Sequence, residues 1–323
     1  LRAPWGSSIE YYYDQNVDEK RTVAAPPACD LGTGVMSPFN AGHGTHVAGL
    51  VAGRDASGNG ISGACQNCGL MVWRISETRC NLTASGFQAE SAIFDESRLI
   101  AALTHLSDIG AQVVNNSFGL ALQGRCADPN ASSDAYCLAL ATASARGVIV
   151  SAAAGNNRGA INFPAEDPRV VAVGGVKDSG EFWADRLDLP GSLLQQECPN
   201  PGLVGNPFGT ECGSNYTVTG SPPTARQEVV MPSLNVQSAF YVGENWNPFI
   251  HCGDGFGGGS TLDGYGACTG TSMSAPIYSG MIGLIRSANP LLLPGSPVPS
   301  AGQPIGLRAV VAMNSSIPGT FNT

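Results

Sequence analysis

Two of the four histidines of the chain stand three residues apart in the segment GHGTHVAG, residues 42–49. Imidazole serves as a metal ligand and as a general base, so this pair allows two kinds of chemistry. A zinc peptidase of the H-E-x-x-H type needs a glutamate between its histidines, whereas Gly44 and Thr45 fill the gap here. A histidine at the start of a helix can instead take the proton of a serine on another helix. The segment therefore raises the question of a partner serine.

The segment GACTGTSMSAP, residues 266–276, contains a candidate nucleophile. Ser272 follows Gly-Thr at the expected start of a helix, where backbone N–H groups and the helix dipole stabilise a developing oxyanion. A serine at this place is also a common N-cap, and the segment alone supports both interpretations equally. It does not match the G-x-S-x-G nucleophile elbow, because residue 274 is serine.

A third segment, VIVSAAAGNN at residues 148–157, is typical of a buried strand that ends in glycine and asparagine. At the carboxyl end of such a strand, where open α/β sheets bind ligands, Asn156 can present its amide N–H to an oxyanion. The alternative is an asparagine that only forms a turn.

The elements that must position these residues follow from hydrophobic periodicity. Short apolar strands alternate with amphipathic helices, which predicts an α/β fold: a mostly parallel sheet flanked by helices on both faces, in a single domain over 1–323. Residues 177–268 break this rhythm as a long Cys/Gly/Pro-rich insertion that contains a strand within 227–240. The other expected elements are helices at 44–53, 91–110, 134–147, from 272 and at 306–314 (after a Pro-rich linker, 290–304), and strands at 69–75, 111–118, 148–155 and 169–175.

Composition limits the class of protein. A net charge of −9 and a pI near 4.8 disfavour nucleic acid as a partner, because phosphates would be repelled. No run reaches the roughly 18 apolar residues of a membrane span. The N-terminal LRAPWGSS lacks the apolar core of a signal peptide, and we interpret the chain as a processed, secreted protein.

The ten cysteines are an even number scattered mainly through loop-like segments, which favours disulfides and an oxidising compartment. The close pairs Cys126–Cys137, Cys198–Cys212 and Cys252–Cys268 are candidate staples, although connectivity cannot be deduced from spacing. Cys65 and Cys68 form a C-x-x-C, but no second ligand pair follows at zinc-finger spacing, so zinc is the minor alternative.

The segments HGTHVAG, SAAAGN and GTSMSAP occur in this order and together resemble the three signature blocks of the subtilisin-like serine proteases. The segments VVNNSFG, GNGISGAC and NFPAEDPRVVAVGG resemble further blocks of that family. The resemblance covers roughly residues 29–176 and 214–316. It implies His43 as the general base, His46 as a supporting residue inside the helix, and Ser272 as the nucleophile. Asn156 would join the Ser272 backbone N–H in the oxyanion hole.

The resemblance also implies a substrate-binding cleft. Ser117, Phe118 and Gly119 would line one side and pair with the substrate backbone as an added strand. The other wall would be formed by Ala153, Ala154 and Gly155. The family analogy requires no cofactor and no catalytic metal; it leaves room for structural calcium, for which no ligand set is visible.

The third member of the triad is missing from its expected place. Members of this family carry an aspartate after an apolar strand some thirty to forty residues before the histidine, which predicts an aspartate-bearing strand upstream of Leu1. Asp14 is the best candidate inside the chain, Asp30 lies only 13 residues before His43, and Asp18 belongs to a charged run.

The sequence thus predicts a secreted, monomeric serine endopeptidase that hydrolyses peptide bonds in proteins or peptides through an acyl-enzyme on Ser272. The alternative is a catalytically impaired, subtilase-like module that binds polypeptides and lacks the triad aspartate. A zinc enzyme using His43 and His46 would differ from both, because chelators would inhibit it and serine reagents would not.

Overall fold

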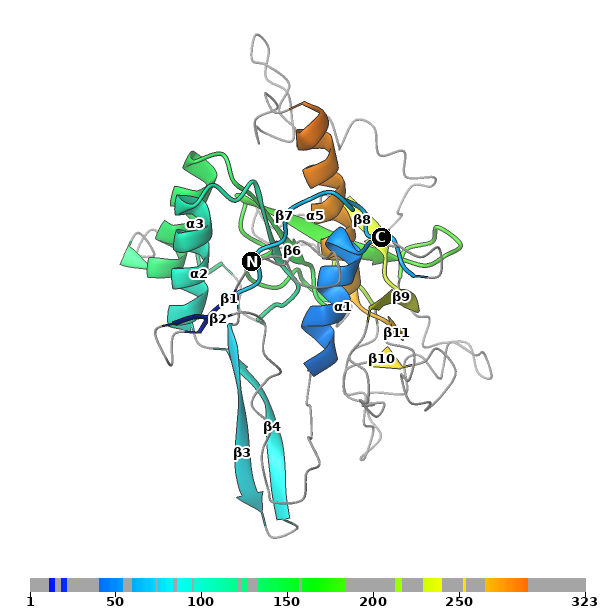
Figure 1. The fold of residues 1–323 in the computed structure, drawn as a ribbon, viewed down its shortest axis with the longest axis horizontal. Helices are drawn as coiled ribbons and strands as arrows, with labels where there is room; N and C mark the ends of the chain where they lie inside the picture. The colour runs from blue at the N-terminus through cyan, green and yellow to red at the C-terminus, as the bar shows by residue number, and fades with distance from the viewer. Residues whose placement is uncertain are drawn as a thin grey trace.

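A computed structural model describes residues 12–14, 19–21, 41–54, 60–73, 75–83, 86–94, 96–120, 124–126, 133–156, 159–183, 213–216, 229–239, 252–253 and 265–289. Its centre is a four-stranded sheet of β5 (Val113–Asn116), β6 (Ile149–Ala153), β7 (Val170–Val176) and β8 (Val229–Pro232). The strands lie in this order and all pairs are parallel (Figure 1). The predicted parallel sheet is confirmed.

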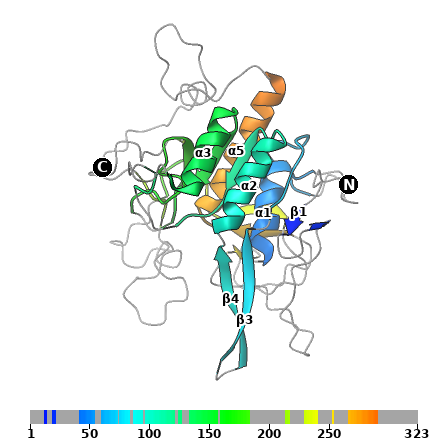
Figure 2. The same cartoon turned by 90° about the vertical axis from the view of Figure 1, so that its left-hand side faces the viewer.

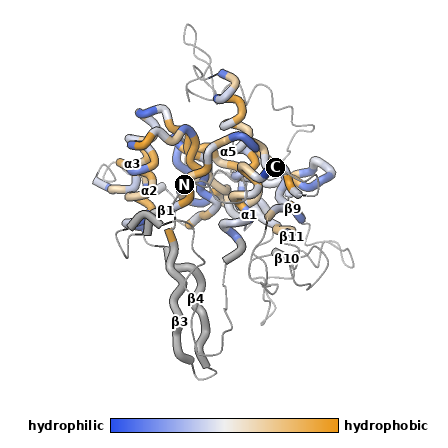
Figure 3. Tube along the Cα trace, viewed as in Figure 1, coloured by the Kyte–Doolittle hydropathy of each residue, from blue (hydrophilic) through white to orange (hydrophobic). Residues whose placement is uncertain are grey.

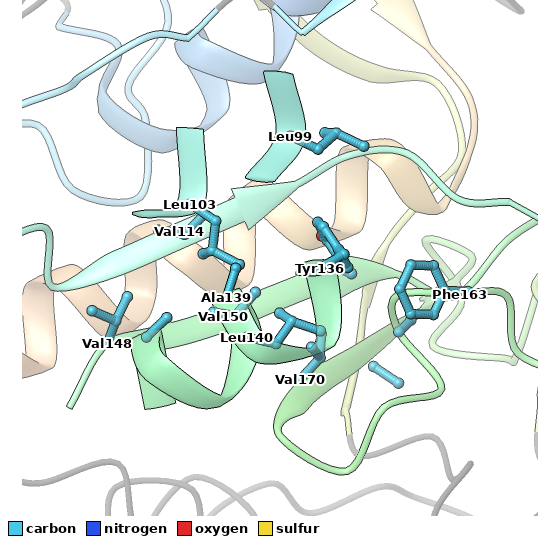
Figure 4. Close-up of a cluster of buried hydrophobic side chains, with 14 of the residues drawn as sticks. Leu99, Leu103, Val114, Tyr136, Ala139, Leu140, Val148, Val150, Phe163 and Val170 are labelled. Atoms are coloured by element: carbon cyan, nitrogen blue, oxygen red, sulfur yellow. The ribbon is translucent and has the colours of Figure 1, made fainter. Parts of the chain in front are cut away.

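Helices cover both faces of this sheet, and strand β6 shows why. Val150 and Ala152 point into a core shared with α2 (Glu96–Asp108) and α3 (Ala135–Ala145), part of which Figure 4 shows. Ile149 and Ala153 point the other way, into a cluster with α5 (Thr271–Ala288). A strand buried on both faces needs a nearly continuous apolar run, and residues 148–155 are apolar except for Ser151, whose hydroxyl is hydrogen-bonded to Ser279. Figure 2 shows α2 and α3 side by side, and Figure 3 shows hydrophobic residues along the covering helices.

Local sequence signals place the ends of α3 as predicted. The Asp134 side chain caps its start by accepting the backbone N–H groups of Tyr136 and Cys137, at 3.0 and 3.1 Å. The helix ends at Ala145, just before Gly147 with φ of 80°. The helix expected over 91–110 was placed too early, because residues 91–94 belong to a strand and α2 begins at Glu96.

The helix of small residues is α1 (Ala41–Ala52), which packs against α5. Glycine allows this close approach: a Cβ on Gly280 would lie 2.7 Å from Ala64 Cβ and 2.9 Å from Val51 O. The prediction of a closely packing helix here is confirmed.

The other strands are antiparallel. A long ribbon of β3 (Ser76–Thr83) and β4 (Gly86–Phe94) extends away from the helices and the central sheet (Figures 1 and 2). The hairpin β1 (Tyr12–Asp14) and β2 (Glu19–Arg21) is separate from the central sheet. A small sheet has the order β10 (Cys252–Gly253), β11 (Tyr265–Cys268) and β9 (Val236–Ala239).

Two further expectations on strands were wrong. Residues 69–73 and 75 form no ladder beyond a bridge at Leu70; they are exposed at Gly69 and otherwise only half-buried, which is less than a central strand requires. The segment 227–240 holds two strands instead of one, and they belong to different sheets. The first of them, β8, completes the parallel sheet, so the segment 177–268 is not purely an insertion. The helix expected at 306–314 and the linker at 290–304 lie outside the described residues.

The cysteines of the described residues are all oxidised. The predicted pair Cys126–Cys137 is a disulfide. Cys65 and Cys68 are bonded to each other as well, which excludes the zinc alternative for that pair. Cys268 is disulfide-bonded, and its Cα lies opposite Cys252 in the β10–β11 ladder; Cys198 and Cys212 lie outside the described residues. No helix of the described part is long and apolar enough to cross a membrane.

Candidate active site

Ser272 is the second residue of α5, and the backbone before it is shaped for close contact. Gly270 precedes the helix with φ of 145°, a conformation that side chains rarely adopt, and a Cβ there would lie 3.2 Å from Asn156 Nδ2. The first four N–H groups of a helix have no partner inside it. The N–H of Ser272 is one of them, so it points toward the N-terminal end of α5 with the positive end of the helix dipole.

Asn156 lies against this first turn. Its Oδ1 accepts hydrogen bonds from Thr271 N (2.9 Å) and Thr271 Oγ1 (2.8 Å). These two donors settle which end of the amide is oxygen, so Nδ2 is directed away from Thr271. Thr271 Oγ1 accepts in turn from Gly155 N at 3.1 Å. The structure therefore places the Asn156 amide against Gly270 and Thr271, at the helix start to which Ser272 belongs.

Ser117 directly follows β5 and forms two hydrogen bonds with Ser272, donating one and accepting the other. Ser117 Oγ donates to Ser272 O at 2.8 Å, and Ser272 Oγ donates to Ser117 O at 3.2 Å. Asn115 Nδ2 donates to Ser117 Oγ at 2.9 Å. Among the described residues the Ser272 hydroxyl has this single partner, so it is not bonded to His43 in this conformation.

His43 lies in the first turn of α1, and its side chain is partly buried. Val51 O contacts Gly280 of α5, and these residues follow His43 and Ser272 by eight positions each. The two helices run in the same direction in Figure 1, so their first turns lie at the same end. The apolar residues between these ends form one cluster: Val47, Leu50, Val236, Cys268, Met273 and Ile277.

His46 belongs to α1, and it is fully buried. Its Nε2 lies 2.9 Å from Val236 O and 3.1 Å from Gly266 O, and because carbonyls only accept, Nε2 carries the proton. Burial lowers the pKa of His46 from 6.5 to about 4, so the ring is neutral near pH 7. An Nε2–H engaged in this way is no metal ligand, and the described residues hold no cluster of three metal-binding side chains. His46 ties α1 to β9 and β11.

The residues expected to bind substrate fall into two groups. Phe118 packs partly against the α2/α3 core, and Gly119 lies so close to Asn162 that a Cβ would come 3.0 Å from its Cβ. Ala153 and Ala154 are buried on opposite faces of the sheet, and only Gly155 beyond them is partly exposed. A wall at 153–155 would thus be formed by backbone. The role of all six residues in substrate binding stays a prediction.

The aspartate remains unassigned. Asp14 ends β1, whose strand partner is β2 and not the central sheet. Asp18 and Asp30 lie outside the described residues. Thr271 and Asn115, by contrast, are contacts of the site that the sequence did not single out. Thr271 had one usable signal, since it stands next to the candidate serine.

Comparison with known proteins adds an independent observation. A family model described as the subtilase family, Peptidase_S8, matches residues 16–316. Subtilisin DY of Bacillus licheniformis is 32% identical over 190 residues, which are 57% of this chain and 61% of that protein. Mycosin-4 of Mycobacterium tuberculosis is 29% identical over 258 residues, 77% of this chain and 49% of that protein. The structure named Sphericase superposes with a TM-score of 0.50 at 20% identity and covers 78% of this chain and 65% of that chain, a likeness of fold. The chain spans roughly half to two thirds of the length of these relatives.

Proposed function

Because the chain belongs to the subtilase family, we propose that it is a serine endopeptidase that cleaves peptide bonds in proteins through an acyl-enzyme on Ser272. The observation that carries this proposal is the group formed by Asn156, Thr271 and Ser272. There, a candidate nucleophile at a helix N-terminus lies beside an amide whose oxygen is held by two hydrogen bonds. The N-cap interpretation of Ser272 is wrong, because the N-cap of α5 is Gly270.

In the proposed mechanism, Ser272 Oγ leaves Ser117 O and turns to His43. His43 accepts the Ser272 proton while Oγ attacks the peptide carbonyl, whose oxygen becomes an anion. The Ser272 N–H and Asn156 Nδ2 stabilise this anion. His43 then protonates the leaving amine, which departs, and a water deprotonated by His43 cleaves the ester and restores Ser272. Catalytic hydrogen bonds are often absent in unliganded structures, so the present Ser272 rotamer is compatible with this role.

An aspartate is needed to hold His43 in the productive tautomer. In subtilisin, loss of the triad aspartate alone lowers kcat by about 3 × 10⁴. We propose that a strand upstream of Leu1 supplies it, with Asp14 as the internal alternative. Without either, the chain would be a polypeptide-binding module with residual activity at most.

The setting of the proposed enzyme follows from its chemistry. Disulfides such as Cys126–Cys137 persist in oxidising compartments, which supports a secreted protein. We propose protein or peptide substrates and a monomer. The reaction as written needs no cofactor; calcium would have a structural role only.

Labelling of the folded chain with a fluorophosphonate, followed by peptide mapping, tests the proposal. We expect covalent modification at Ser272, lost in Ser272→Ala and after denaturation, together with hydrolysis of casein. An intact mass of the active preparation shows whether an upstream segment is present. If a demonstrably folded chain that includes that segment is not labelled, the hydrolase proposal is wrong. Binding of unfolded polypeptides would then support the module.

A further inference from the structure

The carbonyl of Ser272 has no ordinary partner inside its own helix. In an α-helix the carbonyl of residue i accepts the N–H of residue i+4, which for Ser272 is Pro276. Proline has no N–H, and its ring crowds the carbonyl four residues before it. Pro276 is the sixth residue of α5, beyond the first position where helices tolerate proline without losing a hydrogen bond. The helix therefore presents an acceptor without its donor at the residue proposed to be the nucleophile.

The Ser117 hydroxyl fills this place. Its Oγ lies 2.8 Å from Ser272 O and is the donor, because a carbonyl can only accept. The single hydroxyl proton is thereby used, so Ser117 Oγ is the acceptor of the bond from Asn115 Nδ2 at 2.9 Å. The direction of both hydrogen bonds of the Ser117 hydroxyl follows from the Ser272 carbonyl.

The amide oxygen of Asn115 faces the buried interface between the central sheet and α5. Its Oδ1 lies 3.1 Å from Ser279 Oγ, and Ser279 Oγ lies 2.6 Å from Ser151 Oγ. Ser151 is fully buried and Ser279 nearly so. Donors thus run from Asn115 through Ser117 to the Ser272 carbonyl. Ser279 Oγ also lies 2.9 Å from Ala275 O, so its single proton faces two acceptors, and either hydroxyl can be the donor between Ser151 and Ser279. Polar groups buried in this way are stable when every member is satisfied.

We propose that Ser117 is a positioning residue whose hydroxyl replaces the hydrogen bond that Pro276 cannot make, and so fixes the first turn of α5 at Ser272. That turn sets both the Cα of the nucleophile and the direction of its N–H toward the oxyanion. The inference rests on the proposed hydrolase function and goes beyond it, because it assigns the Ser117 side chain to the nucleophile. Pairing with substrate would involve the Ser117 backbone alone.

A double-mutant cycle between Ser117 and Pro276 tests this inference. In the Pro276→Ala background residue 276 regains an N–H, which can reach Ser272 O and take over from the hydroxyl. We expect Ser117→Ala to lower kcat about tenfold with KM nearly unchanged, since an unsatisfied acceptor next to the nucleophile disturbs the transition state more than substrate binding. In the Pro276→Ala background the same change should lower kcat less than about threefold. Ser117→Thr, which keeps a hydroxyl, should recover most of the activity lost in Ser117→Ala.

Ser287→Ala is the matched control. Ser287 Oγ donates to Leu284 O at 2.7 Å in the last turn of the same helix, far along the chain from the site. We expect its loss to leave kcat and KM unchanged. The rate of fluorophosphonate labelling should follow kcat across the series, because it depends on the same nucleophile.

The outcomes separate the two proposals. If wild type is neither active nor labelled, the proposed function fails. The unfolding midpoints of wild type, Ser117→Ala, Pro276→Ala and the double variant still show whether the Ser117 and Pro276 changes are coupled. If wild type is active but Ser117→Ala only raises KM, Ser117 binds substrate and the inference is wrong. Equal losses of kcat in both backgrounds, or no coupling between the unfolding midpoints, would also overturn it.

Discussion

Replacing Asn156 with alanine removes the amide that the structure places against the first turn of α5 and that we propose as an oxyanion donor. The amide is held by two hydrogen bonds from Thr271, through the backbone N and Oγ1. Thr271 is buried, with 1% of its surface exposed, so these bonds are shielded from competing water. Asn156→Ala therefore tests the loss of the amide donor, whereas Thr271→Val tests the loss of one of the two hydrogen bonds that orient this amide.

The expected magnitudes differ for the two changes. Loss of the corresponding asparagine donor in subtilisin costs about 10²–10³ in kcat, and we expect the same range for Asn156→Ala. Thr271→Val keeps the shape of the side chain and the backbone bond but removes one of the two anchors. A net loss of about 1 kcal/mol corresponds to roughly fivefold in kcat. Thr271→Val also leaves Gly155 N without its acceptor, at about 1–3 kcal/mol of stability.

Steady-state hydrolysis of a peptide substrate by wild type, Asn156→Ala and Thr271→Val tests these expected losses of kcat. Unfolding midpoints are measured for the same three proteins. KM should stay nearly constant, because the oxyanion exists only in the transition state and intermediates. Thr142→Val is the control: Thr142 Oγ1 donates to Leu138 O on the exposed side of α3 and should not affect kcat. If folded Asn156→Ala keeps kcat within about threefold of wild type, Asn156 is not an oxyanion donor. If Thr271→Val loses as much as Asn156→Ala, the backbone bond does not hold the amide.

Two further predictions concern stability. Burial lowers the pKa of His46 from 6.5 to about 4, so the unfolded chain binds a proton in this window that the folded chain does not. The free energy of unfolding should fall as pH drops from about 6.5 toward 4, by up to about 1.4 kcal/mol per pH unit relative to His46→Asn. Equal pH slopes in urea unfolding of the two proteins would contradict this. Replacing both Cys126 and Cys137 with serine should cost about 2–3 kcal/mol for a bond that spans 11 residues. The corresponding change at Cys65–Cys68, which spans 3 residues, should cost less, and thermal unfolding of both variants checks the order.

The parts of the fold that the sequence predicts are those whose signals are local. Strands β6 and β7 are apolar runs that only Ser151 interrupts, and α3 lies between Asp134, its N-cap, and Gly147, which follows its end. The segment 69–75 is also a short apolar run, but such runs do not distinguish a strand from other packed backbone. The Trp73 ring packs against His105 of α2 at 5.2 Å between ring centroids, with the ring planes tilted by 45°, and no spacing rule anticipates a contact of that kind. Strand β3 is mostly polar and gives no periodic signal, whereas the pattern of residues 91–94 of β4 predicts the start of a helix, because their apolar residues continue into α2.

At the candidate site the sequence identifies residue types, whereas their hydrogen bonds require the folded chain. Ser272 and Asn156 stand in glycine-flanked segments at the ends of predicted elements, which is enough to single them out. The link from Ser279 to Asn115 joins residues 164 positions apart and could not be read from either segment. Pro276 was visible in the sequence, and its position four residues after Ser272 already implies a carbonyl without a helical donor.

The first turn of α5 thus has polar groups of both kinds that the helix itself does not satisfy. The N–H groups of Thr271 and Ser272 have no acceptor within the helix, as at any helix start: Thr271 N donates to Asn156 Oδ1, and the Ser272 N–H serves the proposed oxyanion hole. The carbonyl of Ser272 is unpaired because of Pro276, and the protein satisfies it from β5 through Ser117. A proline inside a helix is destabilising by about 3 kcal/mol, so an alanine here would favour the isolated helix. The proline instead directs the carbonyl outward to the end of β5, which couples the position of the nucleophile to the strand that is proposed to bind substrate. Ser117 can contact both the nucleophile and a substrate, because its side chain faces Ser272 while its backbone continues from β5.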